Sequence, residues 1–181
     1  MSGTSEVRTL FKAGILAAFV TLAFIGTAVI RIPIPATGGY FNLGDTFVMV
    51  SALLYGPLIG LGVGLIGPAL ADAVGFPQFI LATALVKGFE GLIVGLVAVG
   101  SNRKKGSGAI PALMLGILIL VGGYYLFEAM VYPLLARSVP FFGVTDAKAA
   151  LAEILPNLLQ GVLSAVIAFG IFKVLTGRSK E

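Results

Sequence analysis

Residues 46–71 read TFVMVSALLYGPLIGLGVGLIGPALA, a run of 26 residues without a charged side chain. About 20 apolar residues are enough for a helix to cross the roughly 30 Å hydrocarbon core of a bilayer. Gly56 and Pro57 interrupt the run, because proline lacks a backbone donor and disfavours helix at the residue before it. The run therefore predicts either one long span or two shorter helices joined at Gly56–Pro57.

The rest of the chain has the same apolar character. It is 58% hydrophobic and 11% charged, whereas soluble domains carry about 25% charged residues. Residues 13–30, 109–127 and 154–172 contain no charge, and the roughly ten-residue alternating segments typical of membrane β-barrels are not evident. We predict an all-α integral membrane protein, residing in the cytoplasmic membrane of a prokaryote.

Loop charge decides between the two interpretations of residues 46–71. Positive residues favour the cytoplasmic side of a membrane. They gather in three places, namely Arg8 with Lys12, residues 103–105, and residues 173–180. A tight turn at Gly56–Pro57 places all three groups on one side, which a single long span would not.

Six helices with both termini in the cytoplasm follow from this choice, and they form one membrane domain over residues 1–181. The second helix would be only about 20 Å long at 1.5 Å per residue, too short to span alone. The expected helices cover residues 10–30, 44–56, 57–75, 78–100, 108–136 and 149–174.

The loop before the short helix contains Pro33, Pro35, Gly38 and Gly39, which forbid regular helix. Asp45 follows where a carboxylate is favoured by the unpaired N–H groups of a helix start. We therefore interpret Asp45 as a helix-capping residue. A compatible alternative is that this loop covers a ligand pocket and uses Tyr40 and Asn42.

Lys87 and Glu90 lie in the middle of the fourth expected helix. Each costs about 2.5–3.5 kcal/mol or more at the bilayer centre if unpaired. At a spacing of three residues they share a face and can pair. They are either a buried ion pair that fixes helix packing or, for one of them, a ligand contact.

Further polar residues fall in the outer halves of helices four to six. Glu128 has Tyr125 and Tyr132 at spacings of −3 and +4, and Glu153, Asn157 and Gln160 share one face of the last helix. Their convergence predicts a pocket that opens to the outside. The candidate substrate-binding residues are Tyr40, Asn42, Gln78, Thr83, Lys87, Tyr125, Glu128, Tyr132, Asn157 and Gln160.

Two helix faces carry almost no side chains. Gly56, Gly60 and Gly64 are four residues apart, which allows close contact with a neighbouring helix. Ala13 and Ala17 give the first helix a similar face. It either packs within the protein or docks onto another membrane protein.

The stretch GYFNLGDTFVMVSALLYGPLIGLGVGLIGPALAD (residues 39–72), followed by LVKGFEGLIVG (residues 85–95), resembles the substrate-binding S components of energy-coupling factor (ECF) vitamin transporters. The likeness is greatest to the riboflavin-type and hydroxymethylpyrimidine-type group. It covers more than half of the chain, from the first helix through the fourth.

The resemblance implies six helices and a vitamin bound near the outer side by helices four to six and the first loop. It also implies that a first-helix face matching Ala13 and Ala17 docks onto a transmembrane T component, which couples to two ABC ATPases. No Walker motif occurs in this chain, so ATP hydrolysis would lie in those partners.

Other functions fit the sequence less well. The chain has no cysteine and no histidine, which removes the commonest metal ligands and the usual general base. We expect no enzyme activity, no metal, no cofactor and no nucleic-acid partner. A self-sufficient carrier or channel remains the alternative, although such proteins commonly show internal repeats that are not evident here.

The pocket residues suit a neutral or weakly basic heteroaromatic ligand, because they supply hydrogen-bonding groups and aromatic rings. Riboflavin, pyridoxine and hydroxymethylpyrimidine all meet this description. The sequence does not choose among them.

Overall fold

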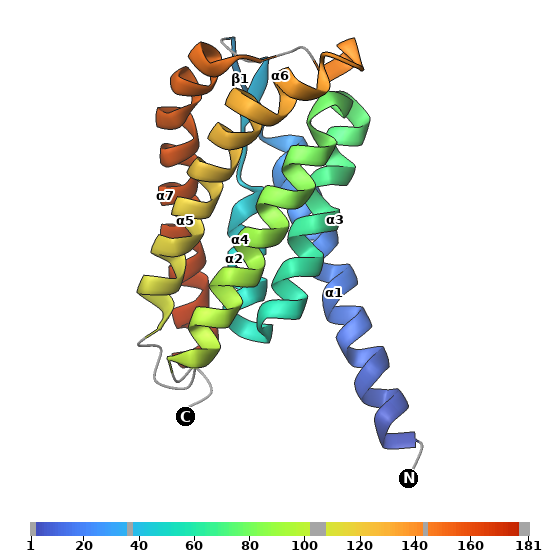
Figure 1. Cartoon of the computed structure of the whole chain (residues 1–181). Helices are drawn as coiled ribbons and strands as arrows, with labels where there is room; N and C mark the ends of the chain where they lie inside the picture. The colour runs from blue at the N-terminus through green and yellow to red at the C-terminus, as the bar shows by residue number, and fades with distance from the viewer. Residues whose placement is uncertain (1–2, 36–37, 102–107, 143–144, 178–181) are drawn as a thin grey trace.

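The computed structural model describes residues 3–35, 38–101, 108–142 and 145–177. These residues form an elongated helical bundle with a small hairpin at one end (Figure 1). The main helices are α1 (Gly3–Val29), α2 (Gly44–Tyr55), α3 (Pro57–Gly75), α4 (Ile80–Gly100), α5 (Ala109–Leu126) and α7 (Ala147–Gly177), with the short α6 (Tyr132–Leu135) after α5.

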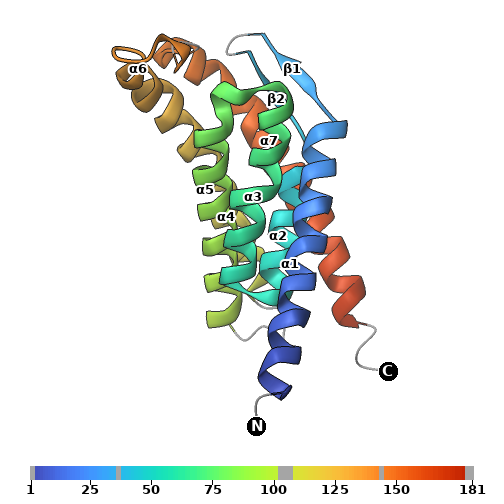
Figure 2. The ribbon, with the colours of Figure 1, turned by 90° about the vertical axis from the view of Figure 1, so that its right-hand side faces the viewer.

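Helix α2 lies in the interior of the bundle, where it contacts α1, α3, α4 and α7. Figures 1 and 2 show it surrounded by these longer helices. Its Val48, Met49 and Leu53 are fully buried. The short helix is therefore a central packing element, and the longer helices around it face the lipid.

The junction between α2 and α3 confirms the prediction of two helices in residues 46–71. Gly56 has φ 93°, a left-handed conformation that glycine adopts without steric cost. Pro57 is the first residue of α3, a position where its missing N–H group is not needed. The chain thus reverses direction within one residue.

Within the described residues, five helices are long and apolar enough to cross a membrane, and α2 has only 12 residues. The N-terminal end of α1, the α2–α3 turn and the C-terminal end of α7 lie at the same end of the bundle (Figure 1). Six spans with cytoplasmic termini stay a prediction. The basic residues 103–105, Arg178 and Lys180, on which the orientation also depends, lie outside the described residues.

Helices α3 and α4 pack through glycine. A Cβ added at Gly64 would overlap the backbone carbonyl of Lys87, and one added at Gly60 would overlap that of Gly91. Glycine at these positions lets the two backbones approach as closely as they do. The glycine row of α3 therefore serves packing within the protein.

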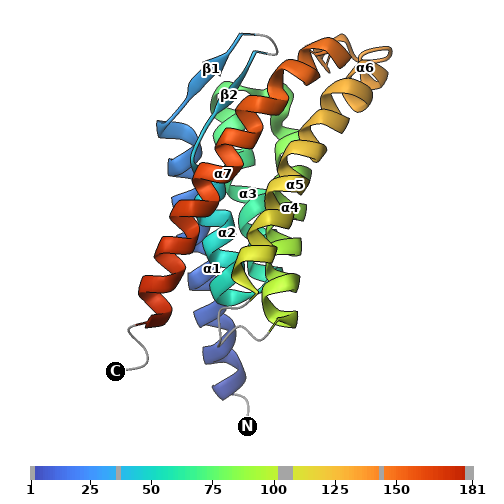
Figure 3. The same cartoon turned by 90° about the vertical axis from the view of Figure 1, so that its left-hand side faces the viewer.

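The first loop contains a β-hairpin that the sequence did not indicate. Strands β1 (Ile32–Ile34) and β2 (Gly39–Phe41) pair antiparallel, with Pro33 opposite Tyr40. Figure 3 shows this hairpin above α2 and beside the upper part of α7. It covers the end of the bundle opposite the chain termini.

The predicted helix over residues 108–136 divides into three segments. After α5 comes the π-helical segment η3 (Phe127–Val131), where the N–H of Tyr132 donates to the carbonyl of Phe127. Helix α6 follows, with Pro133 near its start. Proline cannot donate to the carbonyl four residues earlier, and this favours the wider turn. The extra residue changes the direction of the side chains beyond Phe127.

We predict that Gly64→Ala lowers the free energy of unfolding by about 1–3 kcal/mol, because the methyl group forces α3 and α4 apart. Thermal unfolding in detergent measures the change. Gly122→Ala is the matched control, since its added Cβ would have no neighbour within 4 Å. Equal stability of Gly64→Ala and the unchanged protein would contradict this description of the α3–α4 contact.

Candidate functional site

A buried ion pair lies near the middle of the bundle. Lys87 Nζ of α4 is 2.5 Å from Asp45 Oδ1 of α2, and the two side chains are 1% and 0% exposed. Charges at this depth are tolerated only when they are paired and hydrogen-bonded. The pair therefore fixes α2 against α4.

Two amide side chains complete the polar network around this pair. Gln160 of α7 donates from Nε2 to Asp45 Oδ2 at 2.7 Å, and its Oε1 accepts from the Asn42 backbone N–H at 2.7 Å. Asn42 Oδ1 accepts from the Gly44 N–H at 3.0 Å and lies 3.4 Å from Lys87 Nζ. The network joins the segment after β2 to α2, α4 and α7.

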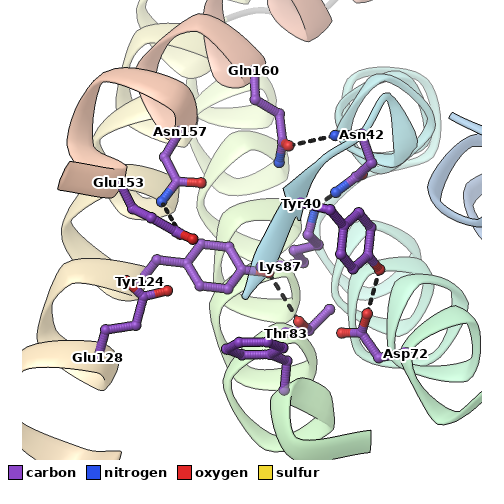
Figure 4. A pocket seen from close by; sticks show the side chains of 12 residues that line it. Tyr40, Asn42, Asp72, Thr83, Lys87, Tyr124, Glu128, Glu153, Asn157 and Gln160 are labelled. Atoms are coloured by element: carbon purple, nitrogen blue, oxygen red, sulfur yellow. Dashed lines mark hydrogen bonds between the residues drawn. The ribbon is translucent and has the colours of Figure 1, made fainter. Parts of the chain in front are cut away.

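A polar pocket lies directly beside this network, under the hairpin. Figure 4 shows side chains entering it from the hairpin and from α3, α4, α5 and α7. Its walls are formed by Gly39, Tyr40, Asn42, Asp72, Phe79, Thr83, Lys87, Tyr124, Glu128, Glu153, Asn157 and Gln160.

The pocket is contracted. Its free space is about 30 Å³, enough for a water molecule, whereas ligand pockets commonly enclose about 300–1,000 Å³. A ligand of vitamin size therefore requires the walls to move. The hairpin residues Gly39 and Tyr40 form a part of the wall that is not built from a helix.

The hairpin is held down by Tyr40 and Arg31. The Tyr40 hydroxyl donates to Asp72 of α3, and burial, reinforced by the Asp72 charge, raises the pKa of the Tyr40 phenol above its usual value of 10.0. The Arg31 guanidinium lies 5.1 Å from the centre of the Tyr40 ring and donates to the Ala71 carbonyl at 2.7 Å. These contacts hold the hairpin over the pocket at the end of the bundle opposite the chain termini.

The opposite wall is acidic. Glu128 comes from η3 and Glu153 from α7, and both side chains line this side of the pocket. Asn157 Nδ2 donates to Glu153 Oε2 at 3.4 Å. Figure 4 shows these three side chains on the side of the pocket away from Tyr40 and Asp72.

The remaining walls supply a hydroxyl pair and an aromatic surface. Thr83 Oγ1 and the Tyr124 hydroxyl are 3.0 Å apart. Phe79 and Tyr124 present rings at the pocket. These groups provide hydrogen bonds and ring contacts, which suit recognition of a small polar molecule.

Seven of the ten predicted substrate-binding residues line this pocket. They are Tyr40, Asn42, Thr83, Lys87, Glu128, Asn157 and Gln160. Gln78 lies in the 3₁₀ segment η1 (Pro77–Phe79) and is half-buried, but the pocket wall there is formed by its neighbour Phe79.

Tyr125 and Tyr132, which were predicted to contact the substrate, are not among the residues that line the pocket. Tyr132 lies beyond the π-helical turn and stacks on Phe142, with ring centres 5.8 Å apart. Tyr125 is half-buried, whereas Tyr124 is the tyrosine that faces Thr83. A spacing argument that assumes a regular helix fails at this turn.

Five pocket residues were absent from the predicted set, namely Gly39, Asp72, Phe79, Tyr124 and Glu153. The sequence already places Glu153 on one helix face with Asn157 and Gln160, although the candidate set does not include it. The place of Asp72 in the pocket wall depends on its hydrogen bond with Tyr40 of the hairpin. Nothing local in the sequence indicates that bond.

Two interpretations of the charged residues need correction. Asp45 makes no side-chain cap bond at the start of α2, because its carboxylate is used by Lys87 and Gln160. Lys87 pairs with Asp45 and not with Glu90. Glu90 is fully buried, and neither of its carboxyl oxygens has a hydrogen-bond partner among the described residues.

Among the described residues, no group of three or more metal-ligating side chains is placed to hold a metal ion. The arrangement offers convergent hydrogen-bonding groups under the hairpin.

Solved structures share this fold. The bundle superposes on the structure titled "Structure and mechanism of the S component of a bacterial ECF transporter" with a TM-score of 0.69, covering 96% of this chain and 99% of that one at 16% identity. The S component for biotin from an ECF-type ABC transporter gives a TM-score of 0.56 at 18% identity, covering 96% and 95%.

Sequence relatives extend across most of the chain. An uncharacterised protein of Pyrococcus woesei is 34% identical over 154 residues, which are 85% of this chain and 94% of that protein. A UPF0397 protein of Lactobacillus delbrueckii subsp. bulgaricus is 27% identical over 139 residues, covering 76% of this chain and 73% of that protein.

The fold is that of the S components of ECF transporters. The model of the family "ECF-type riboflavin transporter, S component" matches residues 4–177. The chain belongs to this family, which is one of transporter components and not of enzymes.

We predict that Lys87→Met alone destabilises the protein by about 3–5 kcal/mol, because it leaves the Asp45 charge buried without a partner. The double variant Asp45→Leu/Lys87→Met should recover much of this loss in thermal unfolding, since apolar residues often replace a buried pair. Lys87→Met/Glu90→Met is the matched comparison. Equal recovery by that variant would contradict the Asp45–Lys87 assignment.

Proposed function

We propose that this protein captures a small heteroaromatic vitamin or vitamin precursor at the outer face of the membrane. The candidate classes are riboflavin, pyridoxine and hydroxymethylpyrimidine. The observation that supports this proposal is the convergence of buried polar side chains from four elements on one pocket, among them Asn42, Thr83, Glu128 and Asn157.

The direction of access follows from the position of the hairpin. Tyr40 and Gly39 of β2 form the pocket wall at the end of the bundle opposite the termini (Figures 1 and 4). Release of the Tyr40–Asp72 bond would open this wall. A ligand then enters from that end, which the charge distribution assigns to the outside.

Delivery into the cell requires partners. We propose a T component and two ABC ATPase subunits, because this chain has no nucleotide-binding motif of its own. The side chains of Ala13 and Ala17 are exposed on α1, whose N-terminal part projects beyond the bundle (Figure 2). Small residues there allow a partner helix to approach closely.

The pocket assignment predicts a loss of binding when Asn157 or Glu128 is truncated. Asn157→Ala and Glu128→Ala should each weaken the binding of the matching vitamin by about 1–3 kcal/mol, the cost of a lost buried polar partner. Titration calorimetry with riboflavin, pyridoxine and 4-amino-5-hydroxymethyl-2-methylpyrimidine identifies the ligand and measures the change. Tyr55→Phe, far from the pocket, is the control. Unchanged affinity in both pocket variants would reject the site.

The docking assignment predicts that binding and uptake can be separated. Ala13→Trp and Ala17→Trp should leave vitamin binding by the purified protein unchanged, because both residues are far from the pocket. They should abolish uptake in cells that supply the T component and ATPases, because a bulky side chain holds a partner helix away. Full uptake with tryptophan at both positions would instead favour a carrier that needs no partner.

A further inference from the structure

Glu128 is a buried acid whose hydrogen bonding is incomplete. Its side chain is 2% exposed and lines the pocket. Its Oε2 atom has no hydrogen-bond partner among the described residues. A buried polar atom without a partner costs about 1–3 kcal/mol, and more when the group is charged, so it marks a position where a donor is expected.

A second carboxyl group reinforces the first. Glu153 reaches the same part of the pocket wall from α7, close enough to Glu128 for the two carboxyl charges to interact. Asn157 contributes one N–H group to Glu153. Two neighbouring carboxylates repel each other unless a proton or a cation lies between them. The wall therefore attracts positive charge and N–H donors.

The cationic side chains near the pocket are already engaged. Lys87 is bound by Asp45, and Arg31 donates to the Ala71 carbonyl and lies against the Tyr40 and Phe76 rings. Arg137 and Lys148, the basic residues on the segments that carry Glu128 and Glu153, are exposed. These cationic side chains therefore have partners other than Glu128 or are exposed, and an N–H donor on a ligand can take the place beside its Oε2 atom.

We propose that Glu128 and Glu153 form a subsite for a protonatable, N–H-bearing edge of the ligand, which makes the ligand an amino-substituted nitrogen heterocycle. This inference rests on the proposed function and narrows its ligand class. The exocyclic amine and the adjacent protonated ring nitrogen of such a heterocycle form two parallel N–H donors. A carboxylate accepts two such donors side by side, as it does from arginine.

The same wall disfavours the isoalloxazine ring of riboflavin. That ring presents a single N–H group between two carbonyl oxygens, and those oxygens would face the carboxylates. The rings of Phe79 and Tyr124 also line the pocket and can contact the face of a planar heterocycle. Charge and shape thus favour a small basic ring.

The test compares two ligands that differ in one group. Titration calorimetry on the full-length protein in detergent uses 4-amino-5-hydroxymethyl-2-methylpyrimidine and its analogue without the amine. The amine-bearing compound should bind at least about tenfold more tightly. Glu128→Gln should remove most of this difference, whereas Glu6→Gln, a change at an exposed carboxylate on α1, should preserve it.

Three results would count against the proposal. Equal affinity for the two pyrimidines, or riboflavin binding that Glu128→Gln leaves unchanged, overturns the subsite but leaves the proposed function standing. Failure of the folded protein to bind any of riboflavin, pyridoxine or the two pyrimidines overturns the proposed function together with the subsite. The ligand comparison needs only the unchanged protein, so instability of a variant does not prevent a decision.

Discussion

The ion pair between Asp45 and Lys87 is the interaction on which the rest of the structure depends. Neither charge is tolerated alone in the interior of a membrane bundle, so α2 and α4 must meet where these residues meet. Gln160 and Asn42 then satisfy the remaining polar atoms of the pair. In this way one ion pair brings the hairpin, α2, α4 and α7 to a common point.

The pocket is a consequence of this arrangement. The network fixes the end of β2 at Asn42, and Tyr40 then reaches Asp72 across the top. On the far side, the π-helical turn at residues 127–131 directs Glu128 toward Glu153. Wide turns of this kind occur frequently at functional sites. The ion-pair network thus supports a pocket that the hairpin covers through the Tyr40–Asp72 bond.

The sequence predicted the elements governed by apolar length and by Gly56–Pro57, because those depend on local composition. It also placed Asn157 and Gln160 on one face correctly, since α7 is regular there. It did not predict the π-helical turn that precedes Tyr132, a residue that is not among those lining the pocket. It also failed at Asp45, whose partner Lys87 is 42 residues away. Long-range pairing and irregular turns leave no periodic pattern to recognise.

The central claim is that this polar pocket holds a small ligand. Native mass spectrometry of the detergent-solubilised protein, purified from cells grown with a full vitamin supply, tests it most directly. We expect one small nitrogen heterocycle bound per protein chain, and its absence from an Asn157→Leu variant that remains folded. A bound species that is retained in that variant, or a protein that carries only lipid, would contradict the claim.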